Sequence, residues 1–268
     1  MKLSIITINY NNHEGLKKTL DSVVAQSFKD FEWIVIDGGS TDGSRELLEE
    51  YAERFAYWVS EPDKGIYNAM NKGIGHAQGE YLQFLNSGDW LCDETALERC
   101  FSHNFDADIV YGNLYFCHDE TKKKYEYPEK LSFSFLRDYS LGHNATFIRR
   151  AVMLEDLYDE NLKIVSDWKF LLIQALKNRK FEHLDEMVSC FDELGISSIN
   201  APMVAAEREQ VGKELFPQLA IEDIVKMEAM DAKLNDNLVK GVLEYGNNKR
   251  LYRKLLNGCL RFIKYIDK

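Results

Sequence analysis

The chain has 268 residues, of which 45% are hydrophobic, 12% aromatic and 29% charged. This composition excludes a disordered chain, and the length suits one large α/β domain or a domain with an appendage. Acidic residues outnumber basic ones by 44 to 33, which gives a net charge of −11. That charge excludes a nucleic-acid partner, because such proteins present a basic face. It does not exclude a small anionic ligand held through a metal ion that carboxylates recruit.

Cysteine usage and hydropathy indicate a cytoplasmic protein. The five cysteines are odd in number and show no CxxC spacing, so we expect reduced thiols rather than disulfides or a zinc site. The first apolar run ends in polar residues at 9–12 and has no cleavage site, which predicts a strand rather than a signal peptide. No stretch approaches the roughly 20 apolar residues of a spanning helix. At most, we expect a peripheral contact at the inner face of the membrane.

The first third of the chain alternates β-branched apolar runs with amphipathic stretches. We expect strands at 3–8, 31–36, 57–60 and 80–85, and helices at 14–26, 44–55 and 67–77. Strands that alternate with helices are typical of βαβ units. The fold class is therefore α/β, with a Rossmann-like, mostly parallel sheet flanked by helices.

The remainder of the body is more mixed. We expect strands at 108–111, 113–117, 181–184 and 188–191, a turn at 118–124 and a helix at 167–176. After about residue 200 the pattern is helical almost to the end, with breaks near Pro217, Gly241 and Gly246. The sequence therefore predicts an α/β domain at 1–200 and a helical C-terminal extension at 201–268.

Polar segments follow four of the expected strands, at 7–10, 37–40, 61–64 and 86–89. In open parallel sheets the ligand site lies outside the carboxyl ends of the strands. There Tyr10 could stack on a base, Asp37 could accept a hydrogen bond from a base, and Asp89 could hold a divalent cation. The alternative for Asp37 is a plain turn with Ser40 or Asp42 as helix cap, and Asp89 could equally cap the segment that follows it.

Several motifs occur in an order that resembles a known family. The chain contains neither GxGxxG nor GxxxxGK[ST], which excludes the familiar dinucleotide and P-loop sites. The segments SIITINYNN, FEWIVIDGGSTDGS, SEPDKGIYNAMNKGIGHAQGEYLQFLNSGDWL and SDWKFLL resemble the inverting family 2 glycosyltransferases of the GT-A fold. The resemblance spans about residues 1–195 and is strongest in 3–91. EPDKGIYNAMNKGI and FLNSGD are similar to bacterial enzymes that build capsule, O-antigen and exopolysaccharide units.

The resemblance implies a nucleotide-sugar part at about 1–91 and an acceptor part at about 92–200. The residues it implies on the nucleotide side are Thr7, Asn9 and Tyr10 beside the base, Asp37 on the base or ribose, Asp63 and Lys64 over the nucleotide, and Lys72 near the diphosphate. Lys72 departs from the family pattern, which usually has an arginine close to this position.

The resemblance also implies a metal site and a catalytic base. The family's D-A-D-D type motif stands here as Asn86-Ser87-Gly88-Asp89. Asn86 and Ser87 would contact the nucleotide sugar, and Asp89 would hold Mg²⁺ or Mn²⁺, which take further ligands from water and phosphates. Asp167 would be the base that deprotonates the acceptor, although its position also suits a helix cap.

His143 is the last candidate of the site, on the acceptor or diphosphate side. The segment GHNATFIRR resembles a strand on the acceptor side of the family. His143 could therefore contact the diphosphate, a metal ion or the acceptor. The alternative is a partly buried histidine whose ring is satisfied by neighbouring groups.

The resulting hypothesis is a non-processive, inverting glycosyltransferase. It would move one sugar from a nucleotide-diphosphate sugar to a carbohydrate or lipid-linked glycan acceptor in surface polysaccharide assembly. The chain lacks the QxxRW pattern of processive synthases. The alternatives are a catalytically silent nucleotide-sugar-binding module and a sugar nucleotidyltransferase, whose Gly-rich phosphate loop is missing here.

The C-terminal segment at 240–268 differs in charge from the rest of the chain. Eight basic and two acidic residues give it a net charge of +6, and leucines and isoleucines accompany them. A basic amphipathic helix can bind anionic lipid, which would suit a lipid-linked acceptor. The alternative is a helix that packs on the body or on a second copy of the chain in a homo-oligomer.

Overall fold

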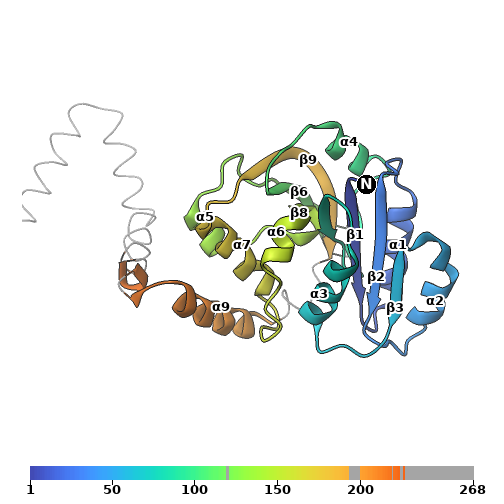
Figure 1. The fold of residues 1–268 in the computed structure, drawn as a ribbon, viewed down its shortest axis with the longest axis horizontal. Helices are drawn as coiled ribbons and strands as arrows, with labels where there is room; N and C mark the ends of the chain where they lie inside the picture. The colour runs from blue at the N-terminus through green and yellow to red at the C-terminus, as the bar shows by residue number, and fades with distance from the viewer. Residues whose placement is uncertain (119–120, 193–199, 219, 224–225, 227–268) are drawn as a thin grey trace, which may run out of the picture. The chain divides into compact units, whose positions relative to one another are not determined.

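The protein is described by a computed structural model covering residues 1–118, 121–192, 200–218, 220–223 and 226. Its first half alternates strands and helices as expected (Figure 1). In chain order these elements are β1 (Leu3–Asn9), α1 (His13–Val24), β2 (Phe31–Asp37), α2 (Ser44–Glu50), the 3₁₀ turn η1 (Ala52–Arg54), β3 (Tyr57–Ser60), α3 (Ile66–His76) and β4 (Tyr81–Phe84).

Four parallel strands form the first part of the sheet, in the order β3-β2-β1-β4. Helices α1 and α2 lie on one face of these strands and α3 on the other (Figure 1). This arrangement follows from right-handed crossovers, because the chain runs outward from β1 to β3 and then returns to β4. Strands β1, β2 and β4 are largely buried on both faces, which explains their continuous apolar runs, whereas β3 at the edge is only partly buried.

The second half extends the same sheet through β8-β6-β9-β5. Its elements are β5 (Trp90–Leu91), α4 (Ala96–Ser102), β6 (Ile109–His118), β7 (Thr121–Tyr125), α5 (Phe133–Asp138), the 3₁₀ turn η2 (His143–Ala145), β8 (Thr146–Arg149), α6 (Arg150–Glu155), α7 (Ser166–Leu176), β9 (Phe181–Asp192) and α9 (Ala201–Leu215). Here β6 and β9 are parallel, whereas β8, β7 and β5 join by antiparallel pairs. The α/β fold class with a sheet flanked by helices is confirmed.

Three expectations about individual elements need correction. The turn expected at 118–124 is wrong for residues 118 and 121–124, because these belong to the paired strands β6 and β7. The exposed lysines of β7 discourage further pairing at this edge. The expected pairs of short strands are single strands, β6 and β9. A register shift at Gly112 interrupts their pairing, and this local irregularity made each look like two strands. The helix expected at 44–55 ends early, because Tyr51 leaves helical geometry.

The chain divides into two compact units, Met1–Glu209 and Gln210–Lys268. The first contains the sheet and all the candidate site residues. Most of the helical extension expected at 201–268, including the basic segment at 240–268, lies outside the described residues. Within the described ranges, no helix combines the length and apolar character needed to cross a membrane.

Candidate active site

The carboxyl ends of β1, β2 and β3 bring three polar side chains together. Asn9, Asp37 and Ser60 end these strands and stand side by side in parallel register. The amide Nδ2 of Asn9 donates to Oδ1 of Asp37 over 2.7 Å. The hydroxyl of Ser60 donates to Oδ2 of Asp37 over 2.6 Å. Asp37 is therefore the centre of a polar cluster at the strand ends.

The carboxylate of Asp37 is buried and engaged by protein donors at both oxygens. Ser40 donates its hydroxyl to Oδ1 (2.6 Å) and its N–H to Oδ2 (2.9 Å), and Gly39 adds an N–H at 3.2 Å. Burial alone would raise the pKa of Asp37, but these hydrogen bonds outweigh it and lower the pKa. Asp37 thus shapes the turn at 38–40 as an ion, and its contact with a base or ribose stays a prediction.

Tyr10 and Asp63 lie over Gly38, beside this cluster. A Cβ atom on Gly38 would come within 2.7 Å of Oδ2 of Asp63 and 3.1 Å of the Tyr10 ring. Because glycine has no side chain, both groups can approach the backbone at position 38. The Tyr10 ring is 66% exposed and can stack on a flat ligand. An exposed ring beside a carboxylate has the chemistry needed to hold a nucleobase.

The other residues predicted on the nucleotide side lie in different settings. Thr7 is buried in β1, where its hydroxyl accepts a hydrogen bond from the indole of Trp33 (3.0 Å). Lys64 is exposed in the connection between β3 and α3. Lys72 forms an ion pair with Glu61 (Nζ–Oε1, 2.8 Å). A diphosphate would therefore compete with Glu61 for the ammonium group of Lys72.

Asp89 ends the turn that follows β4. Its side chain is buried, and its Oδ1 accepts the backbone N–H of Asp192 on β9 (3.0 Å). The N–H of Ser87 donates to the carbonyl of Ile8 (3.0 Å), which ties the turn to β1. Asp89 does not cap a following helix, because Trp90 begins strand β5.

His143 lies between the two acidic residues predicted for metal binding and catalysis. Its Nε2 is 3.4 Å from Oδ2 of Asp89, and its Nδ1 is 3.9 Å from Oδ2 of Asp167. The amide of Asn86 lies 3.0 Å from Nε2. Burial alone would lower the pKa of His143, but the contacts with Asp167 and Asp89 outweigh it and raise the pKa to about 9. The raised pKa favours the protonated form of this ring, which lies between the two carboxylates.

Asp167 lies in the first turn of α7 but does not cap the helix. The single hydroxyl proton of Tyr67 is shared between Oδ1 of Asp167 (3.0 Å) and the carbonyl of Ile164 (2.5 Å). Burial and the charge of Asp167 raise the pKa of Tyr67 well above its ordinary value, so this hydroxyl stays a donor. The Asp167 side chain remains 22% exposed, which leaves room for an acceptor to reach it.

The donor set around Asp89 suits an ion that takes most of its ligands from the substrate. Among the described residues there is no cluster of three or more acidic, histidine or cysteine side chains that would hold a metal. The carboxylate of Asp89 and the amide oxygen of Asn86 are hard donors, the type that Mg²⁺ and Mn²⁺ accept. Such an ion would complete its coordination with water and diphosphate oxygens.

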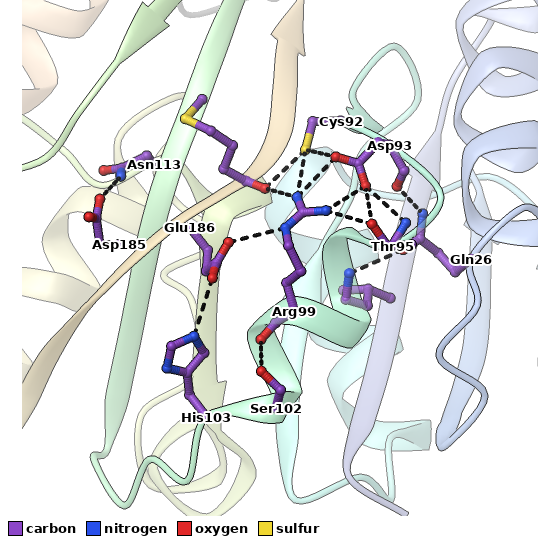
Figure 2. A network of polar contacts seen from close by, with 12 residues as sticks. Gln26, Cys92, Asp93, Thr95, Arg99, Ser102, His103, Asn113, Asp185 and Glu186 are labelled. Atoms are coloured by element: carbon purple, nitrogen blue, oxygen red, sulfur yellow. Dashed lines mark hydrogen bonds and ion pairs between the residues drawn. The ribbon is translucent and has the colours of Figure 1, made fainter.

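A second polar network centres on Arg99 and includes none of the predicted site residues (Figure 2). Its guanidinium pairs with Asp93 through two nitrogens (2.8 and 2.9 Å) and with Glu186 through Nε (3.1 Å). His103 contacts the other oxygen of Glu186 (3.2 Å). The contact with Arg99 lowers the pKa of Asp93 below its usual range. This network borders a cavity of about 420 Å³ and joins α4 to β9.

Comparison with known proteins identifies the family of the chain. The model of the glycosyl transferase family 2 matches residues 4–155. The chain belongs to glycosyl transferase family 2. An uncharacterised family relative from Mycobacterium tuberculosis is 51% identical over 88 residues, which cover 32% of this chain and only about a third (34%) of that relative. A PGL/p-HBAD biosynthesis glycosyltransferase from Mycobacterium bovis is 27% identical over 202 residues, covering 72% of this chain and 77% of the relative.

Solved structures show that this member of glycosyl transferase family 2 has the GT-A fold. The 1–349 fragment of S. aureus TarS in complex with UDP superposes with a TM-score of 0.58 at 20% identity, covering 72% of this chain and 60% of that one. The mannosyltransferase PcManGT from Pyrobaculum calidifontis, in complex with GDP-Man and Mn²⁺, gives a TM-score of 0.57 at 14% identity. That match covers 95% of this chain and 82% of the other.

Sequence reasoning missed several residues of the candidate site in this member of glycosyl transferase family 2. Tyr67, which contacts Asp167, lies inside the quoted EPDKGIYNAMNKGI motif and could have been singled out there. Ser40 and Ser60, which engage Asp37, look like ordinary turn and strand-end residues. Glu207 of α9 follows no motif at all, and only the folded chain brings it to the segment before α7.

Proposed function

We propose that the chain is a non-processive, inverting glycosyltransferase that moves one hexosyl or related group from a nucleotide-diphosphate sugar to a carbohydrate or lipid-linked glycan acceptor in surface polysaccharide assembly. The observation that carries the proposal is the position of the His143 ring, 3.4 Å from Asp89 and 3.9 Å from Asp167. The ring joins a diphosphate-side carboxylate to a partly exposed carboxylate that can meet an acceptor. The solved neighbours that bind UDP and GDP-Man support a nucleotide-sugar donor.

The proposed reaction gives each of these groups a role. Asp167 accepts the proton of the acceptor hydroxyl, and the freed oxygen forms a bond to the anomeric carbon of the donor. The bond from that carbon to the diphosphate breaks, and its electron pair leaves with the nucleoside diphosphate. One displacement from the opposite face inverts the configuration. Tyr67 keeps the Asp167 carboxylate oriented through its hydroxyl.

A divalent cation belongs to the same proposal. Asp89 would be its protein ligand, with the amide oxygen of Asn86 as a second donor. When bound, Mg²⁺ or Mn²⁺ would neutralise negative charge on the leaving diphosphate. The imidazolium of His143 stands beside the same carboxylate and supplies a fixed positive charge from the chain itself. The neighbour that binds Mn²⁺ supports this use of a cation.

The first test uses a panel of UDP-, GDP- and dTDP-sugars with Mn²⁺ or with EDTA. We expect at least one donor to raise the melting temperature and to be slowly hydrolysed without acceptor, in the presence of Mn²⁺ only. The responding donor is then used for transfer with Asp167→Asn, which we expect to bind nucleotide as the wild type does but to lose transfer by roughly 10²-fold or more. Asp106→Asn, at a 94% exposed carboxylate, is the matched control.

Each outcome of this test has a distinct meaning. If no nucleoside diphosphate shifts the melting temperature, the proposed donor class is wrong. If the donor binds but Asp167→Asn turns over at the wild-type rate, the role of Asp167 is wrong while the donor site stands. Activity that survives in EDTA would contradict the use of a cation.

A further inference from the structure

Helix α9 lies beyond residues 4–155, which the family model matches, and carries no motif of its own. Two neighbouring residues of this helix nevertheless contact the segments on both sides of Asp167. Glu207 contacts the backbone before Asp167, and Arg208 contacts Trp168, the residue directly after it. These contacts all lie within the compact unit Met1–Glu209.

The carboxylate of Glu207 holds the turn that leads into α7. Its Oε1 accepts the N–H of Lys163 (2.6 Å), and its Oε2 accepts the N–H groups of Ile164 (2.9 Å) and Val165 (3.2 Å). Glu207 is buried, with only 9% of its surface exposed. Three hydrogen bonds to a buried anion are strong, because each one is charge-assisted. The turn is thereby fixed as one unit.

This turn is connected directly to the candidate base. The carbonyl of Ile164, in the middle of the clamped turn, accepts the hydroxyl of Tyr67 at 2.5 Å. The same hydroxyl lies 3.0 Å from Oδ1 of Asp167. A shift of the turn would therefore move both the start of α7 and the tyrosine that contacts the base.

Arg208 fixes the other side of Asp167. Its guanidinium lies over the indole ring of Trp168, 4.7 Å from the centroid, and its Nη1 donates to the carbonyl of Asp138 (2.7 Å). The Trp168 indole in turn donates to the carbonyl of Leu136 (2.7 Å). The first turn of α7 is thus held between α9 and the end of α5.

We propose that α9 is part of the catalytic machinery, with Glu207 as a positioning residue that sets the location of Asp167. The expected loss of rate rests on the proposed function. The expected shift of the turn at 163–165 rests on the hydrogen bonds alone. A general base must lie within hydrogen-bond distance of the proton it takes, so a displacement of about 1 Å can cost on the order of 10²-fold in rate.

The test compares Glu207→Ala and Glu207→Gln with a matched control, Arg99→Ala. The control breaks a charged network of similar size whose contacts include neither Asp89, His143 nor Asp167 (Figure 2). For each variant, kcat is expressed per nucleotide-binding site measured by titration with the donor's nucleoside diphosphate. A loss of folded protein then has no effect on this ratio, because it lowers the measured rate and the number of binding sites by the same factor.

We expect Glu207→Ala to lower this normalised kcat by roughly 10- to 100-fold with the donor KM within about twofold of the wild type. Glu207→Gln keeps one acceptor oxygen, so its normalised kcat should lie between that of Glu207→Ala and that of the wild type. Arg99→Ala should keep the normalised kcat of the wild type. A Glu207→Ala variant with the wild-type value would overturn the inference, even where Asp167→Asn shows that the base assignment is right.

A crystal structure of Glu207→Ala tests the inference whether or not a donor is found. We expect the turn at 163–165 to shift and the contact between Tyr67 and Asp167 to lengthen beyond hydrogen-bond distance. An unmoved turn, with Asp167 still about 3.0 Å from the tyrosine hydroxyl, would show that Glu207 does not position the base. The same crystal structure would show directly whether the rest of the fold is retained.

Discussion

His143 links the two carboxylates that the site depends on. Its side chain is only 17% exposed, and without Asp89 and Asp167 such a ring would be neutral. In its protonated form the ring places a positive charge 3.4 Å from Asp89 and 3.9 Å from Asp167, which attracts both carboxylates. Protonation of this ring should therefore be visible in the pH dependence of the stability of the chain.

We predict that the contribution of His143 to stability declines between pH 6.5 and about 9. Its pKa is raised to about 9 in the folded chain from an ordinary 6.5. The stabilisation is therefore complete below pH 6.5 and is lost as the pH rises through 9. In EDTA, the difference in unfolding free energy between wild type and His143→Gln should shrink by on the order of 2 kcal/mol across this window.

Urea unfolding of both proteins at pH 6.5 and pH 9.5 measures this difference. Tyrosine and cysteine titrations affect wild type and variant alike, so they cancel in the subtraction. A difference that stays constant over the window would show that His143 is not charged in the folded chain.

At the scale of elements, helix α1 organises the turn that presents Asp89. The hydroxyl of Thr19 is buried between the helix and this turn. It donates to the carbonyl of Asp89 (2.7 Å) and accepts the N–H of Gly88 (3.1 Å). Gly88 has a φ of +106°, a conformation that side chains disfavour, so the turn depends on such contacts to keep its shape.

We predict that Thr19→Val destabilises the chain by about 1–3 kcal/mol, because the isosteric side chain leaves the buried Gly88 N–H and Asp89 carbonyl without their partner. Thr19→Ser keeps the hydroxyl and should lose clearly less. Urea unfolding gives both values. Equal losses for the two variants would mean that packing of the methyl group, and not the hydrogen bonds, accounts for the effect.

The parallel half of the fold could be predicted because its signals are local. Each strand there is a short apolar run that ends in a polar turn, and β1 and β2 appear within one residue of the expected bounds. The antiparallel half was less predictable. The exposed lysines of β7 look like a loop until β6 is there to pair with them.

The site residues divide in the same way, into those with a local sequence signal and those that only the folded chain reveals. Asp167 and Asp89 stand in recognisable motifs, and the folded chain brings both to His143. Glu207 could not be found in this way, because its partners are backbone N–H groups more than 40 positions away. Backbone groups carry no sequence signal, so a residue that binds them is visible only once the chain is folded.

Charge is distributed unevenly over the whole molecule. The segment at 240–268 has a net charge of +6, which leaves −17 for residues 1–239 out of the total of −11. An acidic body is repelled by anionic lipid, whereas the basic segment is attracted to it. We predict that this segment recruits the chain to anionic membranes, where a lipid-linked acceptor would be found.

Co-sedimentation with phosphatidylglycerol vesicles tests this prediction on the full chain. Each basic residue near such a surface contributes about 1 kcal/mol, so the combined change K249Q, R250Q, R253Q and K254Q should weaken binding by roughly 100-fold or more. The matched control changes the three exposed lysines of β7, K122Q, K123Q and K124Q, and should bind nearly as the wild type does. Raising the salt concentration should weaken wild-type binding, because screening shortens the range of the attraction. If the four-residue variant binds vesicles as the wild type does, the basic segment has another role. A loss of self-association in the same variant would identify that role as contact between copies of the chain.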